Sequence, residues 1–385
     1  MGEVRLMNKK LTLFVFVDAF GWEVYKNYGF LGDLLPYARR LETTFGFSSA
    51  ADPSILTGRY PDEHTHWSCF YYSPQTSPFK CMKLVSFLPR CIFDRWRFRH
   101  WLSKILAKML GWTGYFEMYS VPFSVLPYFD YAEKRDYFVP GGIMRTDTIF
   151  DYCVKKGIKY HCSNWRKSEP EVLSDIREQI ELEQMEFAYL YLPKLDAVMH
   201  RYGTVAPQVE DKIRWLEQQV RQITELAKQH YEQVSLYAIS DHGMANVSGS
   251  VDLIAKIEAT GLKFGTDYVA MYDSTMARFW FMNEKSKDAI QSVLQGVKEG
   301  YIVSYEELEK MHVFFDDHRF GDTIFLMNAG ILIVPSFMGL TSIPGMHGYH
   351  PHDKDSYSFI LGASPLGEDI NSITDIRKVM EQELD

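Results

Sequence analysis

Three apolar, β-prone runs at positions 11–17, 187–192 and 234–240 constrain the fold of this chain most strongly. Their nearly continuous hydrophobicity is typical of central parallel strands that are buried on both faces. Helix-like patterns at 170–184 and 209–231 separate these runs. Strands that alternate with helices predict an α/β fold, with a doubly wound, mostly parallel central sheet and helices on both faces.

Two stretches interrupt this alternation, and the 385 residues leave room for them. Residues 62–142 are aromatic and irregular, and we predict that they form a basic aromatic cap insertion. Residues 244–344 carry strand and helix signals of their own and are predicted to form a second, α+β cap insertion. The core is then expected to comprise residues 1–61, 143–243 and 345–385.

Composition excludes several classes of protein. Hydrophobic residues make up 46% and charged residues 24%, which is ordinary for a globular protein and unlike a disordered or fibrous one. The net charge of −9 argues against a general coat for nucleic acid. No uninterrupted apolar stretch reaches the roughly 18 residues that a transmembrane helix needs. The first apolar run is too short, and with Asp18 too acidic, for the core of a signal peptide.

The cysteines indicate a reducing compartment. They are scattered, odd in number and form no CxxC pair: Cys69, Cys81, Cys91, Cys153 and Cys162. We therefore expect a cytoplasmic protein whose cysteines are small buried apolar residues.

An aspartate stands at or just beyond the carboxyl end of each apolar run: Asp18, Asp196 and Asp241. In doubly wound sheets, functional sites form beyond the carboxyl ends of the strands. A single aspartate at such a place is more often a helix cap or a turn residue. Three of them, on three predicted strands of one sheet, indicate a shared site.

Histidines accompany these aspartates. Asp196 and His200 stand four residues apart, so one helical turn would place both on the same face. Asp241 and His242 are adjacent at a strand end, and glycine near His347 permits close backbone approach. Three carboxylates and three imidazoles suit two divalent cations, such as zinc or manganese.

A candidate nucleophile lies in the segment 46–61, which reads as a turn that leads into a short helix. A serine at the start of that helix, Ser48 or Ser49, would lie where backbone N–H groups and the helix dipole favour phosphate. A bound metal would activate its hydroxyl. Taken alone, the segment favours a simpler interpretation, in which the serine is only the N-cap of the helix.

Taken together, these motifs resemble the alkaline phosphatase superfamily, and most closely its type I phosphodiesterase/nucleotide pyrophosphatase branch. The resemblance extends over residues 11–365. It rests on the ordered set Val17-Asp18, Ser48 nine residues before Thr57-Gly-Arg-Tyr-Pro61, Asp196-x-x-x-His200, Asp241-His242-Gly243 and His347-Gly-Tyr349.

The resemblance implies a hydrolase of phosphodiesters or phosphoanhydrides that forms a covalent phospho-serine intermediate. It implies two ion sites, one formed by Asp18, Ser48, Asp241 and His242 and the other by Asp196, His200 and His347. In this family the nucleophile stands nine residues before the threonine that matches Thr57, which selects Ser48 and leaves Ser49 as the alternative.

Two departures from the family leave the leaving group open. The branch usually has threonine at the position of Ser48 and asparagine at that of Ala51. A phosphomonoesterase or phosphonate hydrolase on the same core is therefore an alternative, as is a catalytically silent metal-binding module. A sulfatase is disfavoured because the x-Pro-x-Arg continuation of its signature is absent after Ser48.

The insertions are where we expect substrate selection, because the metal core is generic. Eight basic residues lie within 80–108, against Asp94 alone: Lys80, Lys83, Arg90, Arg95, Arg97, Arg99, Lys104 and Lys108. From Trp101 onward, apolar residues recur every three to four positions. The segment 80–110 is either a cap helix packed on the core, a peripheral contact with an anionic membrane, or a cap over a lipid-linked diester.

Arg278 lies in a predicted strand of the second insertion. It either binds the substrate or forms an edge-strand salt bridge, and the sequence favours the salt bridge. The expected partner is a small-molecule or lipid-linked phosphodiester, and the oligomeric state is left open.

Overall fold

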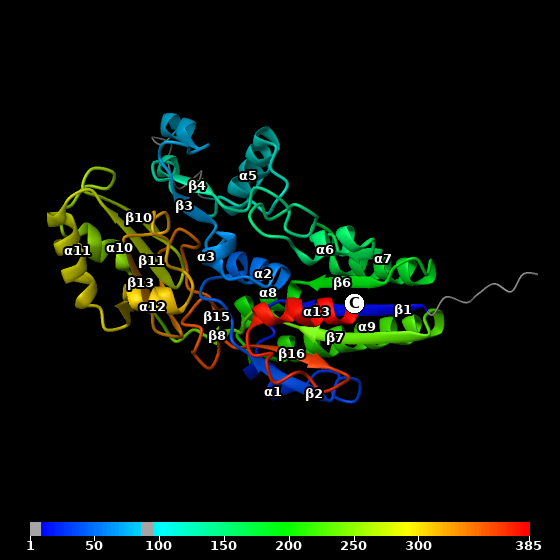
Figure 1. Cartoon of the computed structure of the whole chain (residues 1–385). Coiled ribbons are helices and arrows are strands. Elements are labelled where there is room, and N and C mark those ends of the chain that lie inside the picture. The colour runs from blue at the N-terminus through cyan, green and yellow to red at the C-terminus, as the bar shows by residue number, and fades with distance from the viewer. Residues whose placement is uncertain (1–8, 86–94) are drawn as a thin grey trace, which may run out of the picture.

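The computed structural model describes residues 9–85 and 95–385. Its central sheet has the strand order β2-β16-β7-β1-β6-β5 (Figure 1). The strands are β1 (Lys10–Val17), β2 (Tyr37–Leu41), β5 (Tyr160–Cys162), β6 (Phe187–Leu192), β7 (Gln233–Ile239) and β16 (Ser358–Gly362). Strand β1 pairs in parallel with β6 and β7, and β5 with β6, whereas β16 is antiparallel to β7 and β2. The predicted mostly parallel α/β sheet is confirmed, and its three predicted strands are neighbours.

Helices cover both faces of this sheet. Leu11, Leu13, Val15 and Val17 of β1 share a buried cluster with residues of α7 (Glu169–Glu181), α8 (Lys194–Tyr202) and α9 (Pro207–His230). Phe14 and Phe16 belong to another cluster, with residues of α2 (Ser48–Thr57), α6 (Ile149–Lys156) and α13 (Ile376–Leu384). Apart from Lys10 and Thr12, β1 is apolar, because the strand is buried on both faces from Leu11 onward.

The inserted segments build a second body on one side of the sheet (Figure 1). The first contains β3 (Phe70–Tyr72), β4 (Phe129–Tyr131) and α5 (Trp96–Leu110). The second contains an antiparallel sheet of order β10-β11-β13-β12, formed by Tyr268–Tyr272, Met276–Phe281, Thr323–Met327 and Gly300–Ile302. Helices α10 (Leu253–Glu258), α11 (Glu284–Gln295) and α12 (Tyr305–Lys310) accompany it.

Both inserted segments contribute to one hydrophobic cluster. It joins Phe70, Phe116 and Tyr131 of the first segment to Ala270 and Phe279 of the second. The two predicted caps therefore pack together, while their exact sequence limits stay a prediction. Arg90, Cys91 and Asp94 of the basic segment lie outside the described residues.

Shorter elements complete the described chain: α1 (Trp22–Tyr28), α3 (Pro61–His64), η1 (Lys80–Val85), η2 (Leu126–Tyr128), β8 (Ala245–Asn246), β9 (Gly249–Val251), β14 (Ile331–Ile333), β15 (Gly345–Met346) and η3 (Ile373–Asp375). Among residues 9–85 and 95–385, no helix combines the length and the apolar character needed to cross a membrane.

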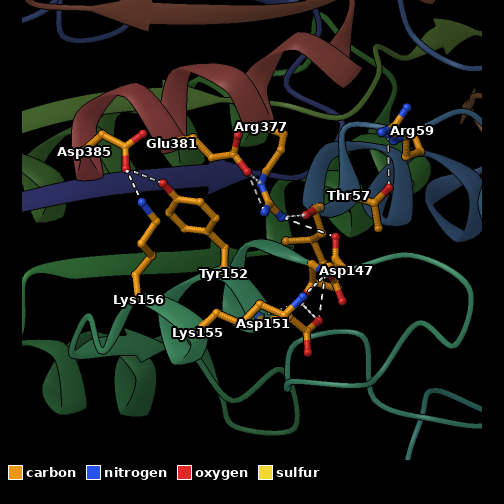
Figure 2. A network of polar contacts seen from close by, with 12 residues as sticks. Thr57, Arg59, Asp147, Asp151, Tyr152, Lys155, Lys156, Arg377, Glu381 and Asp385 are labelled. Carbon is orange, nitrogen blue, oxygen red and sulfur yellow. Dashed lines mark hydrogen bonds and ion pairs between the residues drawn. The ribbon is translucent and has the colours of Figure 1, made fainter.

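Helix α2 is fixed to the C-terminal helix by a buried arginine (Figure 2). Arg377 of α13 is 8% exposed, and its Nη1 donates to the backbone oxygen of Leu56, 2.8 Å away, at the end of α2. Its Nε donates to Glu381 at 2.8 Å. The contact satisfies a carbonyl that the helix itself leaves unpaired at its C-terminus. It holds in place the helix that begins at Ser48.

We predict that Arg377→Met lowers the free energy of unfolding by about 1.5–3 kcal/mol, because it removes buried charge-assisted hydrogen bonds. The matched control is Arg59→Met, which breaks only the exposed pair between Arg59 and Glu63 and should cost less than about 1 kcal/mol. Urea unfolding of both variants measures the difference. Equal losses would show that the Arg377 contact does not stabilise the helix.

Candidate metal centre

The predicted ligands meet at the carboxyl edge of the central sheet. Asp18 follows β1, Asp241 lies two residues beyond β7, and Asp196 is the third residue of α8, directly after β6. Because β1 lies between β6 and β7, these ends are adjacent. The side chains form two groups, Asp18/Asp241/His242 and Asp196/His200/His347, and within each group the ligand atoms lie within 4.8 Å of one another.

Backbone contacts orient the first group. The Oδ1 atom of Asp241 accepts a hydrogen bond from the N–H of Ala19 at 3.0 Å. The Nδ1 atom of His242 lies 3.0 Å from the carbonyl of Gly243, which can only accept, so Nδ1 carries the proton. The unprotonated Nε2 then faces Oδ2 of Asp241 at 2.9 Å. Two acceptor atoms at this distance repel each other unless a cation or a proton lies between them.

The second group repeats this arrangement on one face of α8. His200 directs Nδ1 to the carbonyl of Gly345 at 2.8 Å and leaves Nε2 3.1 Å from Oδ1 of Asp196. The Nε2 atom of His347 lies 3.6 Å from the same oxygen. A hydrogen bond from the second imidazole nitrogen fixes the orientation of a metal-binding histidine in this way.

Strand β15 brings the two groups together. It pairs antiparallel with β8, so that Met346 lies opposite Ala245. His347 then stacks on His242, with 3.9 Å between the ring centroids. Glycine is required here, because a Cβ atom at Gly345 would lie 2.4 Å from the carbonyl oxygen of Met199.

The donor set fits divalent cations. Several buried atoms at the site find no hydrogen-bond partner among the described residues: Asp18 Oδ1, Asp52 Oδ1, Asp196 Oδ1, Asp241 Oδ2 and His347 Nδ1. Asp18, Asp52, Asp196 and His347 line a cavity of 510 Å³, and no lysine or arginine of the described chain lines it. Mixed carboxylate and imidazole donors of this kind are typical of zinc and manganese sites.

Burial and neighbouring charged groups shift the pKa values of the candidate ligands. Burial, followed by the negative charge of Asp241 and Asp196, raises the pKa of Asp18 well above its usual range. Burial, followed by the neighbouring imidazoles, lowers the pKa of His347 well below its usual range. Burial lowers the pKa of His242, but the adjacent Asp241 carboxylate outweighs burial, so the net shift is upward.

The two candidate nucleophiles point in different directions. Ser48 is the first residue of α2, and its Oγ lies 3.1 Å from Nε2 of His242. Ser49 donates its hydroxyl to the carbonyl of Trp67 at 3.3 Å. The N-cap is Phe47, so the interpretation of either serine as the helix cap is wrong.

Arg278 does not extend into the site. It is fully buried, and its guanidinium donates to Asp273 at 2.9 Å, to the carbonyl of Phe70 at 2.8 Å and to Ser68 at 2.9 Å. The structure therefore does not support the substrate contact, because all three guanidinium nitrogens already donate hydrogen bonds inside the protein. The ion-pair alternative describes it better, although β11 is an inner strand and not an edge strand.

Sequence reasoning missed several residues of the cavity wall. Asp52 lies one helical turn after Ser48, is 7% exposed and lines the cavity. The four-residue spacing from Ser48 was a usable signal. Three of the six aromatic side chains of the wall, Tyr115, Tyr119 and Phe138, come from the first inserted segment, where no spacing pattern marks them. The other three are Phe47, Trp165 and Tyr191.

We predict that Asp18→Asn increases the stability of the metal-free protein at neutral pH. Because the pKa of Asp18 is raised by folding, its carboxyl stabilises the fold fully only below the unfolded pKa of about 3.9. This contribution is lost as the pH rises through the folded-state pKa. Urea unfolding in chelator, compared at acidic and neutral pH, should therefore show a weaker loss with rising pH in the variant. The exposed control Asp316→Asn should lose stability with rising pH as the wild type does. The same pH dependence in Asp18→Asn would contradict the prediction.

Known proteins share both the sequence family and the fold. The family model for type I phosphodiesterase/nucleotide pyrophosphatase matches residues 13–350. Comparison with curated protein sequences gives no significant match. Among solved structures, murine ectonucleotide pyrophosphatase/phosphodiesterase 5, as an inactive variant in complex with AMP, aligns with a TM-score of 0.67 at 15% identity. The human enzyme of the same name aligns with a TM-score of 0.67 at 14% identity.

Each of these alignments covers 97% of this chain and 95% of the solved one. At such low identity the likeness shows the fold, which is alkaline-phosphatase-like. The family match extends over most of the chain and includes all the predicted ligands and both serines. The chain therefore belongs to the type I phosphodiesterase/nucleotide pyrophosphatase family and is a metal-dependent phosphoric ester hydrolase.

Proposed function

We propose that this chain hydrolyses a phosphodiester or phosphoanhydride with Ser48 as the nucleophile and with two divalent ions, preferably zinc. Asp18, Asp241 and His242, together with Ser48, would hold one ion, and Asp196, His200 and His347 the other. The observation that carries the proposal is the 3.1 Å approach of the Ser48 hydroxyl to His242, within one of two adjoining ligand groups.

The position of Ser48 suits attack on phosphorus. The hydroxyl lies at the N-terminal end of α2, where the helix dipole favours the negative phosphoryl group. When bound, the two ions would stabilise negative charge on the phosphoryl oxygens and lower the pKa of the hydroxyl. In the first step the bond between Ser48 Oγ and phosphorus forms and the bond to the leaving oxygen breaks. The proton of the Ser48 hydroxyl passes to the leaving oxygen.

The second step regenerates the enzyme. Water attacks the phosphorus of the phospho-serine, the bond to Ser48 Oγ breaks, and a phosphate monoester departs while a proton returns to the serine. His242 and His200 are held in fixed orientations by their Nδ1 contacts, so the geometry around phosphorus is set before the substrate binds.

The cavity supports a small-molecule substrate. Its 510 Å³ lie within the usual size of a ligand pocket, and Tyr115, Tyr119 and Trp165 supply flat apolar surface beside the metal ligands. A nucleotide diester is the first substrate class that we propose, since a relative of the same fold was solved with AMP. A lipid-linked diester is the second, because the apolar wall also suits an acyl or isoprenoid chain.

We further propose a cytoplasmic location. Its support is that Cys69, Cys81, Cys153 and Cys162 are free thiols. Burial raises the pKa of Cys153 to about 12, which keeps that thiol protonated and unreactive.

We predict that Ser48→Ala lowers kcat/KM for bis-p-nitrophenyl phosphate by at least about 10³-fold, or roughly 4 kcal/mol, because the attacking oxygen is lost. Ser49→Ala is the matched control and should retain activity within about tenfold, since its hydroxyl donates to the carbonyl of Trp67 and belongs to neither ligand group. Ser48→Thr restores a hydroxyl and should recover turnover. A larger loss in Ser49→Ala than in Ser48→Ala would assign the nucleophile to Ser49.

The same assay includes p-nitrophenyl phosphate, with and without chelator. Chelator-sensitive cleavage that prefers the diester supports the phosphodiesterase assignment. A preference for the monoester would instead support the phosphomonoesterase alternative.

We predict that His347→Ala reduces bound metal from two ions per chain toward one, because it removes a ligand of the second group. His350→Ala is the control, since that side chain lies nearby but contacts Glu307 and belongs to neither ligand group. Elemental analysis after equilibration at low free zinc measures the difference. Full occupancy in His347→Ala would contradict the ligand assignment.

A further inference from the structure

The outward face of α5 carries an unusual combination of side chains. Arg97, Trp101, Lys104 and Lys108 follow one another at spacings of four, three and four residues, which places them on one side of the helix. All four are exposed, and Trp101 retains 59% of its accessible surface. An indole thus lies in solvent, surrounded by three cations. We call these four residues the outer face of α5.

The opposite face shows that α5 is built into the fold. Phe98, Leu102 and Leu106 pack against the hydrophobic cluster of the inserted segments. Arg99 is 2% exposed, donates to the carbonyl of Val121 at 2.8 Å and lies over the ring of Phe123. The cap-helix interpretation of this segment therefore accounts for the inner face. It leaves the outer face unexplained.

The charge of the outer face is not neutralised locally. No aspartate or glutamate occurs between residues 95 and 116. Within the described chain, Arg97, Lys104 and Lys108 form no ion pair. Exposed cations such as Lys26, Arg59 and Lys310, in contrast, each pair with a carboxylate three or four residues away. This local positive charge contrasts with the net charge of −9 of the whole chain.

Apolar side chains extend this surface at both ends of the helix. Trp96 is 71% exposed at the start of α5 and Met109 is 77% exposed at its end. Figure 1 shows α5 at the periphery of the molecule, away from the central sheet. Exposed indoles beside lysine and arginine match the interface of an anionic bilayer, where the ring inserts between headgroups and the cations contact phosphates. A nucleic-acid duplex would be met mostly by the cations alone, because its bases are stacked inside.

We propose that the outer face of α5 docks the protein on an anionic lipid bilayer. Charge complementarity supplies the attraction, and insertion of Trp101 favours a bilayer over other polyanions. The docking does not depend on the hydrolytic reaction, because none of the four residues lines the active-site cavity.

The test is cosedimentation of the full chain with phosphatidylcholine vesicles, with and without phosphatidylserine. We expect binding only to the anionic vesicles, and its loss at high salt. The triple variant Arg97→Gln/Lys104→Gln/Lys108→Gln should weaken the partition coefficient on the order of 100-fold, at roughly fivefold per cation. Trp101→Ala should weaken it several-fold while leaving the charge unchanged.

The matched control is Lys256→Gln/Lys285→Gln/Lys298→Gln, which removes three exposed cations from the second inserted segment. It should bind anionic vesicles as the wild type does, to within the small effect of net charge. Circular dichroism and hydrolysis of a soluble diester should be unchanged in every variant, which separates docking from folding and from the proposed reaction.

Three results would overturn the proposal. They are failure of the wild type to bind anionic vesicles, equal loss in the two triple variants, and binding of double-stranded DNA that is stronger than vesicle binding and insensitive to Trp101→Ala. The last result would make the outer face a general polyanion surface.

Discussion

Mutual repulsion of three carboxylates at one edge of a buried sheet is the constraint on which the rest of the site depends. Asp18, Asp196 and Asp241 converge because β1 lies between β6 and β7. The carboxylates of Asp18 and Asp241 have ligand atoms within 4.8 Å of each other. In a poorly hydrated environment, negative charges this close repel each other strongly. His200 and His242 donate from Nδ1 to backbone carbonyls. In that form each neutral ring offers the lone pair of Nε2 and adds no positive charge to offset the carboxylates. Divalent cations bound at this edge would relieve the repulsion, which links the fold to the proposed chemistry.

The proposed nucleophile depends on packing that lies far from it. Helix α2 presents Ser48 to the first ligand group at one end and is held at the other by Arg377. Close backbone packing fixes the facing loops, since a Cβ atom at Gly243 would lie 2.1 Å from the carbonyl oxygen of Asp355. Such rigid support suits a reaction that is accelerated mainly by preorganised charge. The geometry of the site is therefore a property of the whole core.

The central sheet and the grouping of the candidate ligands could be predicted because their signals are local. Continuous apolar runs mark strands that are buried on both faces, and an aspartate after each run marks the functional edge. Asp52 was missed because a single carboxylate within a short helix resembles a surface residue until its burial is known. For Arg278 the sequence favoured a salt bridge but left a substrate contact open, because it does not show that Asp273, Ser68 and Phe70 enclose the guanidinium.

The inserted segments were harder to predict for a physical reason. Their common core joins residues about 200 positions apart, such as Phe70 and Phe279, and no periodicity links such distant pairs. Helix α5 shows both what the sequence could predict and what it could not. Its apolar spacing predicted an amphipathic helix, whereas only the structure separates the inner face, which packs on the protein, from the outer face, which does not.

The most direct test of the account is the number and position of metal ions in crystals of the zinc-loaded protein. Anomalous diffraction at the zinc edge should give two peaks, one between Asp18, Asp241 and His242 and the other between Asp196, His200 and His347. Density for the Ser48 hydroxyl should lie beside the first peak. A single peak, or peaks away from these side chains, would contradict the two-ion site and the serine chemistry that follows from it.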